Sequence, residues 1–180
     1  ERVFMAERNA SGGWREVRYA EMLQITRHIA SALLTRGLSA DRPIVILSGN
    51  SVDHALLAFG ALYAGIPYVP VSPAYSLVSK DYSKLSYLMK LLTPGMVFVD
   101  DADAFAGAIH ANVPDDVEVV TSFGALPDRR VTLLADLLAT PVAADPEPVH
   151  EASGPDSNAK FLPPHGTTGP PQAADHTDAT

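Results

Sequence analysis

The apolar residues of this chain repeatedly change their spacing between that of a strand and that of a helix. In 14–19, apolar and charged residues alternate, which predicts a short edge strand. In 20–36, apolar residues recur at helical spacing, and Gly37 follows as a C-terminal cap, so this segment predicts an amphipathic helix. The predicted apolar stripe of the helix consists of Met22, Leu23, Ile25, Ile29, Ala30, Leu33 and Leu34.

Further along the chain, short apolar runs alternate with helical segments. Runs that are apolar on both faces are typical of buried parallel strands. The predicted strands are 43–47, 68–71, 96–99, 117–120 and 159–162. The predicted helices between them are 51–64, with Ser51 as its N-cap, 79–92, 103–111 and 133–138. Prolines at 67, 70 and 73 would confine the 68–71 strand to an edge or to a short, irregular stretch.

This order of elements predicts an α/β fold, because helices that alternate with strands act as crossovers in a largely parallel sheet. We expect residues 1–139 to form an α/β subdomain. From Thr140 the composition changes to Pro, Ala, Asp and Glu, which predicts a linker or loop over 140–158. Residues 159–180 would hold a strand, a glycine-containing loop and the polar tail of a truncated domain.

Composition narrows the class of protein. The formal net charge is −8 and the chain has no run of Lys or Arg, which argues against a nucleic-acid partner. Cysteine is absent, which excludes disulfides and thiolate ligands and suits a cytoplasmic protein. The most apolar segment, 55–65, is shorter than the ~20 residues that span a bilayer, so no membrane partner is expected.

Few residues stand out as candidates for chemistry. Gly166-Thr167-Thr168-Gly169 follows a predicted strand, and glycines let a turn direct several N–H groups at one anion, although such a tetrapeptide is more often only a turn. Asp100-Asp101 at a strand end could bind a metal, but such a pair more often lies in a solvated turn. We interpret His28 and His54 as ordinary packing or surface residues, and we predict no catalytic or metal-binding residue.

Two longer segments resemble the adenylate-forming superfamily, which includes acyl-CoA and aryl-CoA synthetases, peptide-synthetase adenylation domains and firefly luciferase. The sequence A-G-I-P-Y-V-P-V-S-P at 64–73 is similar to an early signature of the family. P-H-G-T-T-G-P-P-Q-A at 164–173 resembles its phosphate-binding loop, T-S-G-[ST]-T-G-x-P-K-[GA]. Both occur in the family's order. The segments 46–50, 54–57, 72–79 and 91–95 look like the feruloyl-CoA synthetase branch.

The resemblance implies that the α/β fold is part of the N-terminal layered domain of these enzymes. It also implies an AMP-forming ligase, in which a carboxylic acid reacts with ATP and Mg²⁺ to give an acyl-adenylate, and coenzyme A then displaces AMP. The partners would be a carboxylic acid, possibly related to ferulate, together with ATP and coenzyme A. The residues implied to hold the ATP phosphates are Gly166, Thr167, Thr168, Gly169 and Gln172.

The chain departs from the family at this loop. Gln172 stands where the family has lysine, so the loop keeps hydrogen-bond donors without the charge. Pro164 and His165 replace the threonine and serine before the glycine. The family's later adenine, ribose and catalytic-lysine elements do not follow. We therefore expect an inactive N-terminal fragment that binds none of the cofactors tightly. The alternative is a non-catalytic α/β interaction module that shares the fold.

Overall fold

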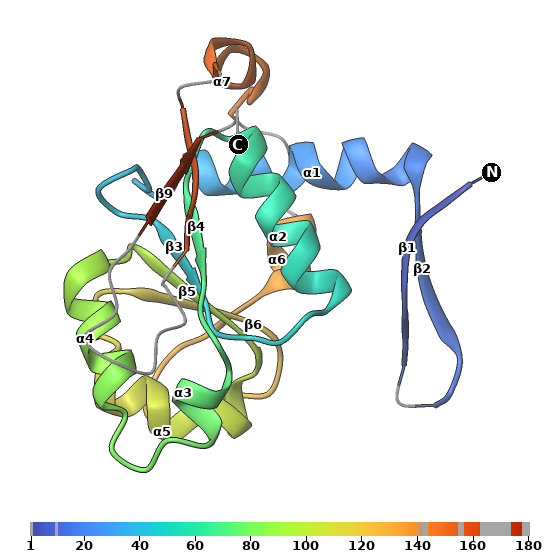
Figure 1. Cartoon of the computed structure of the whole chain (residues 1–180). Coiled ribbons are helices and arrows are strands. Elements are labelled where there is room, and N and C mark those ends of the chain that lie inside the picture. Colours follow the sequence, from blue (N-terminus) through green and yellow to red (C-terminus); the bar gives the residue numbers. More distant parts are fainter. Residues whose placement is uncertain are drawn as a thin grey trace.

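The computed structural model describes residues 2–9, 11–139, 141, 144–154, 157–162 and 174–177, with the backbone alone for 158 and 174–177. These residues form an α/β domain built on a sheet in which six neighbouring strands run parallel and one outer strand is antiparallel (Figure 1). In spatial order the strands are β7 (Thr132–Leu133), β6 (Glu118–Phe123), β5 (Met96–Asp101), β3 (Ile44–Ile46), β4 (Tyr68–Pro70), β8 (Asn158–Leu162) and β9 (Ala174–Thr177). The predicted α/β class and largely parallel sheet are confirmed.

Helices cover both faces of the sheet. One face packs against α1 (Tyr19–Leu34), α2 (Val52–Tyr63) and α6 (Leu134–Ala139), and the other packs against α4 (Ser83–Leu92) and α5 (Ala102–Asn112). Side chains of a strand alternate between the faces, so a strand covered on both sides is apolar throughout. In β3, Ile44 and Ile46 contribute to the α1–α2 core, and Val45 contributes to the α4–α5 core.

The strand order reverses in the middle of the sheet. From β3 the chain passes through α2 to β4 on one side, and from β5 it passes through α5 to β6 on the other. Because strand–helix–strand crossovers are right-handed, these opposite directions place α2 and α5 on opposite faces. The boundary between β3 and β5 is therefore the switch point of the fold, where ligands bind in sheets of this kind.

A two-stranded hairpin lies at one side of the domain, beside α1 and α2 (Figure 1). It consists of β1 (Val3–Arg8) and β2 (Trp14–Arg18) in antiparallel pairing. The strand predicted over 14–19 is confirmed, whereas β1 was not predicted. Phe4 contacts Tyr19 and Phe59 edge-on, with ring centroids 4.8 and 5.7 Å away, and so packs the hairpin onto both helices.

The helix predicted over 79–92 begins later than expected. The helix α4 starts at Ser83, because Tyr82 has a left-handed backbone with φ of 52° that cannot continue a helix. The carboxylate of Asp81 accepts a hydrogen bond from the backbone N–H of Ser83 at this end. A separate short helix, α3 (Ala74–Leu77), follows β4 instead.

The 68–71 strand is short, as expected, but it is not at an edge. The strand β4 lies between β3 and β8. Pro70 fits there because the N–H of Val71 donates to Ile46 of β3, so by alternation the nitrogen of Pro70 faces β8. On that side β4 pairs with β8 at Tyr68↔Lys160, so the missing N–H of Pro70 leaves the pairing with β3 intact.

Two other expectations differ from the structure. The predicted apolar stripe of α1 is wider than its buried face. Leu23 is 50% exposed and Met22 is half-buried, whereas Ile29 and Leu33 are in the core. Three short elements were also not predicted, namely β7, β9 and α7 (Glu147–Ala152). The helix α7 lies within the segment predicted as linker or loop, where Glu147 accepts hydrogen bonds from Arg27 at 2.5 Å and from the hydroxyl of Tyr63 at 2.7 Å.

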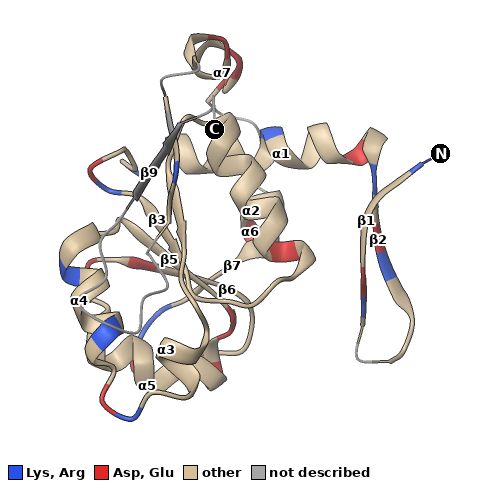
Figure 2. Cartoon of the chain, in the orientation of Figure 1, with Lys and Arg blue, Asp and Glu red and all other residues tan. Residues whose placement is uncertain are grey.

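Charged residues are distributed over the described helices, strands and turns (Figure 2). Acidic and basic positions alternate along the hairpin, where Arg15 and Glu7 pair across the strands at 3.1 Å. Among the helices of the described ranges, none combines the length and the apolar character that crossing a membrane requires.

Candidate functional site

The candidate site lies where the parallel strands end. The carboxyl ends of β3, β4, β5 and β8 are at one edge of the sheet, because the four strands are parallel neighbours. The strand β8 ends at Leu162, and the predicted phosphate-binding loop follows it. Its residues, Gly166, Thr167, Thr168, Gly169 and Gln172, lie outside the described residues, so their role stays a prediction.

Polar side chains follow the apolar core at this edge. Three fully buried residues stand in register on adjacent strands: Ile46, Phe98 and Val120. Side chains two positions further along a strand point to the same face, so Ser48, Asp100 and Ser122 come next on the α2 side. The Oγ of Ser122 is buried and has no hydrogen-bond partner among the described residues. The carboxyl ends of the strands at the switch point are therefore polar, although the strand residues that precede them on this face are apolar.

His54 contacts this polar row from the first turn of α2. Its Nδ1 lies 3.0 Å from the carbonyl oxygen of Gly49 and 3.4 Å from the Oγ of Ser48. Burial lowers the pKa of the imidazole, while the Gly49 carbonyl and the charge of Asp100 act in the opposite direction. A neutral His54 that donates from Nδ1 to the carbonyl keeps a lone pair on Nε2. The imidazole can therefore accept a hydrogen bond or a proton.

We expect His54 to make the stability of the domain depend on pH. Its pKa is lowered in the folded state from the ordinary value of 6.5, so as the pH falls below 6.5 the unfolded chain binds this proton first. The free energy of unfolding should therefore decrease as the pH falls from 7 towards 5. Urea melts of the protein and of His54→Asn, whose amide can still donate to Gly49, would measure the His54 contribution. An identical pH slope for both proteins would contradict it.

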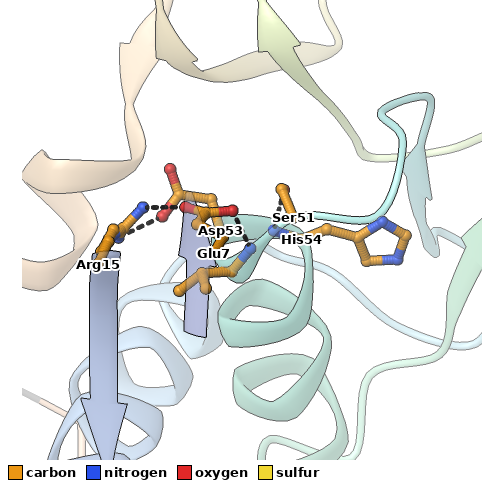
Figure 3. A network of polar contacts seen from close by, with 6 residues as sticks. Glu7, Arg15, Ser51, Asp53 and His54 are labelled. Carbon is orange, nitrogen blue, oxygen red and sulfur yellow. Dashed lines mark hydrogen bonds and ion pairs between the residues drawn. The ribbon is translucent and has the colours of Figure 1, made fainter. Parts of the chain in front are cut away.

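The N-terminus of α2 is filled by the chain's own polar groups (Figure 3). Ser51 caps the helix by accepting from the N–H of His54 at 3.0 Å, as the sequence predicted. Glu7 of β1 accepts from the N–H of Val52 at 2.8 Å. Since a carboxylate is the kind of group that binds a helix N-terminus, an external anion would have to displace Glu7. This helix end therefore has a structural role.

A single arginine links the hairpin to the same helix end. Arg15 pairs with Asp53 at 2.6 Å and with Glu7 at 3.1 Å (Figure 3). The hydrogen bond to Asp53 is the largest cause that raises the pKa of Arg15. Because one guanidinium holds a carboxylate from each element, it fixes the position of β1 and β2 relative to α2.

A groove of about 320 Å³ runs along α2 towards β4. Its wall is mostly apolar and includes Ala58, Phe59 and Leu62, while His54 and Tyr68 contribute polar groups. Burial raises the pKa of the Tyr68 phenol, which therefore stays protonated and can donate a hydrogen bond. Tyr68 pairs with β8, the strand that leads to the predicted loop. This arrangement can hold an apolar group with one polar end.

The two aspartates at the end of β5 have separate roles. Asp101 caps α5 by accepting from the N–H groups of Asp103 and Ala104. Asp100 is half-buried and faces the α2 side of the edge. In the ranges that the structure describes, no three His, Asp or Glu side chains form a group suited to a metal ion. The structure thus uses Asp101 as a helix cap, where sequence reasoning expected a solvated turn.

Sequence reasoning missed the grouping of His54 with Asp100 and Tyr68. These residues come from α2, β5 and β4, and only the reversal of strand order brings their elements together. One signal was available. His54 follows the helix cap Ser51 by three residues, which places it in the first turn of a helix that begins at a strand's carboxyl end.

A layered α/β domain with a parallel sheet, helices on both faces and polar carboxyl ends matches the N-terminal domains of adenylate-forming enzymes. The family model described as AMP-binding enzyme matches residues 1–180. The chain belongs to this AMP-binding enzyme family.

Individual relatives agree with this assignment. The structure of ATP-bound MatB from Rhodopseudomonas palustris is 27% identical, with a TM-score of 0.68 over 98% of this chain and 32% of that chain. The fatty acyl CoA synthetase of Mycobacterium tuberculosis is 25% identical, with a TM-score of 0.64 over 91% of this chain and 30% of that chain. A protein of Salinispora arenicola described as a probable non-canonical nonribosomal peptide synthetase, CymA, is 27% identical over 108 residues, which are 60% of this chain and 1% of that protein. The chain thus spans about a third of these solved structures and a far smaller share of CymA.

Proposed function

We propose that this chain is the N-terminal part of an AMP-forming acid–thiol ligase. The enzyme would activate a carboxylic acid with ATP and Mg²⁺, release pyrophosphate, and transfer the acyl group from the adenylate to coenzyme A. The observation that carries the proposal is the match of the AMP-binding enzyme family to the whole of residues 1–180. Similarity to ATP-bound MatB and to a fatty acyl CoA synthetase supports the use of ATP and an acyl substrate.

The proposed acid is an aryl acid related to ferulate. This part of the proposal rests on the segments that resemble feruloyl-CoA synthetases, such as 72–79, which leads from the end of β4 into α3. The proposed place of action is the cytoplasm.

The loop after β8 would receive the β- and γ-phosphates of ATP. Backbone N–H groups of Gly166 to Gly169 and the hydroxyls of Thr167 and Thr168 are suitable donors. Gln172 would donate a hydrogen bond where the family has a lysine charge. The loop would hold the phosphates without taking part in proton transfer.

The 180-residue chain alone should show no ligase activity. The chain spans 32% of ATP-bound MatB, and the adenine, ribose and catalytic-lysine elements that the family resemblance implies do not occur in these 180 residues. Purified chain with ATP, Mg²⁺, ferulate and coenzyme A should release no acid-dependent pyrophosphate and form no thioester. Either product above the level of a sample without ferulate would refute this expectation.

The reading frame beyond Thr180 tests the proposed function itself. A frame that continues for the length of a family member, when expressed whole, should give ferulate-dependent pyrophosphate release followed by thioester formation. A full-length product that releases pyrophosphate with other acids would refute ferulate and keep the ligase. A frame that stops after Thr180 would instead favour the non-catalytic interaction module.

The loop should bind ATP weakly in this chain for three reasons. Gln172 lacks the lysine charge, Pro163 and Pro164 remove two N–H groups ahead of the loop, and the family's nucleotide-binding elements do not occur in these 180 residues. Replacing Gln172 by lysine should strengthen anion binding only slightly, since an exposed charge pair contributes ~0–1 kcal/mol. Isothermal titration of both proteins with ATP and Mg²⁺ measures the difference, with Gln172→Met as the control for side-chain length. Micromolar binding by the unmodified chain would show that the altered loop is functional.

A further inference from the structure

A second groove, of about 600 Å³, lies at the edge of the sheet opposite the carboxyl ends. It is formed by the last turns of α4 and α5 and by the segments that lead into β5 and β6. Because β5 and β6 are parallel, both segments are at the amino ends of the strands. Its volume is in the range typical of small-molecule sites. The groove is therefore separate from the candidate site at the switch point.

The walls of this groove are fixed by hydrogen bonds. Arg129 donates to the carbonyl oxygens of Val113 at 2.8 Å and Pro114 at 2.6 Å, and it also donates to that of Val117. On the opposite wall, the N–H of Thr93 donates to the carbonyl oxygen of Met89. These bonds hold both loops in place, so the groove is preformed and does not depend on a ligand to order it.

Two basic side chains line the groove without an acidic partner. Arg42 lies across Gly95, where an added Cβ would come within 3.2 Å of its Nε, so the glycine makes room for the arginine side chain. Lys90 lines the groove from the last turn of α4. Neither makes an ion pair within the described part of the chain. Their charges are therefore available to a ligand.

The remaining charges limit what kind of anion fits. Asp116 also lines the groove, and the C-terminal ends of α4 and α5, which border it, carry partial negative charge. Both oppose a dianion such as phosphate. The floor includes the exposed apolar residues Ala111 and Pro114 beside the buried Met89 and Val117, so binding gains from an apolar group that covers it. A single negative charge on an apolar body suits this combination.

We propose that this groove is a second binding site, which takes a small molecule with an aromatic or aliphatic body and one carboxylate. The body covers the apolar floor, and the carboxylate accepts hydrogen bonds from Arg42 and Lys90. The proposal does not depend on the ligase function, because the groove is on the opposite edge of the sheet and contains none of the residues assigned to ATP.

Amide NMR of the 180-residue chain, titrated with 2-naphthoate, tests the site. We expect saturable shifts of the amides of Lys90, Thr93 and Asn112. The double variant Arg42→Gln, Lys90→Gln should weaken binding by about tenfold, because it removes two exposed charge pairs. Lys80→Gln changes an exposed lysine outside the groove and should leave the affinity unchanged.

A neutral analogue tests the role of the carboxylate, and a variant with a larger side chain in the groove tests the role of the apolar body. The alcohol 2-naphthalenemethanol should bind more weakly than the acid and should not respond to the double variant. Ala111→Phe should reduce the binding of both compounds, provided that a thermal melt shows a folded protein. No saturable shift, shifts confined to the α2 groove, equal affinity for acid and alcohol, or tighter binding of inorganic phosphate would each overturn the proposal.

Discussion

Replacing Leu33 by alanine should lower the free energy of unfolding by ~2–5 kcal/mol. The side chain is 0% exposed and lies on α1 in the core shared with α2 and α6. Truncation removes buried methyl groups and leaves a cavity that the surrounding helices cannot fully close. Alanine is the best helix former, so helix propensity would act slightly in the opposite direction. Denaturant melts followed by circular dichroism measure the loss.

Leu23 supplies the matched control on the same helix. It is 50% exposed, so Leu23→Ala should change the free energy of unfolding by less than ~0.5 kcal/mol. The two variants make the same chemical change and differ in burial. Equal losses would show that the packed face of α1 is wrongly assigned.

Replacing Gly60 by alanine should also destabilise the domain, by ~1–3 kcal/mol, although alanine is the better helix former. An added Cβ on Gly60 would come within 2.3 Å of Cγ2 and 2.7 Å of Cβ of Ile29. Both atoms are close to the backbone of α1, so rotation of the Ile29 side chain cannot relieve the contact. Relief requires α1 to move away from α2. The same denaturant melts measure the effect.

A second glycine variant and a double variant test whether the loss of stability comes from the contact between Gly60 and Ile29. On α5, a Cβ on Gly107 would meet only the hydroxyl end of Tyr82, at 2.8 Å, which a small rotation can move, so Gly107→Ala should cost less. In the presence of Ile29→Ala, the contact with Cγ2 is gone and only the contact with Cβ at 2.7 Å remains, so Gly60→Ala should lose part of its cost. A stabilising Gly60→Ala would mean that the two helices are further apart than the structure has them.

The candidate site was only partly accessible to sequence reasoning. The resemblance of 64–73 and 164–173 to family signatures led to the family that the comparison supports. The polar contacts of His54 were not foreseen, because its partners are a carbonyl oxygen of Gly49 and the charge of Asp100 on another strand. Residue type and spacing do not report such contacts.

The sequence by itself determined the elements whose signal is local and repeated. The strand β3 and residues 96–99 of β5 are uniformly apolar, and helices such as α2 begin at a capping serine, so each could be located from a few neighbouring residues. The parallel sheet follows from their order, because each crossover needs a helix.

Only the tertiary structure decided the elements whose stability comes from distant partners. The hairpin strand β1 is held through Glu7 and Phe4 by residues of α2, and α7 is held through Glu147 by Arg27 and Tyr63. The strand β4 can lie inside the sheet because the nitrogen of Pro70 faces β8 and not β3. The exposure of Leu23 depends on how far α1 extends beyond the core. Each of these outcomes is set by contacts between segments far apart in the chain, and the local pattern carries no information on which segments will meet.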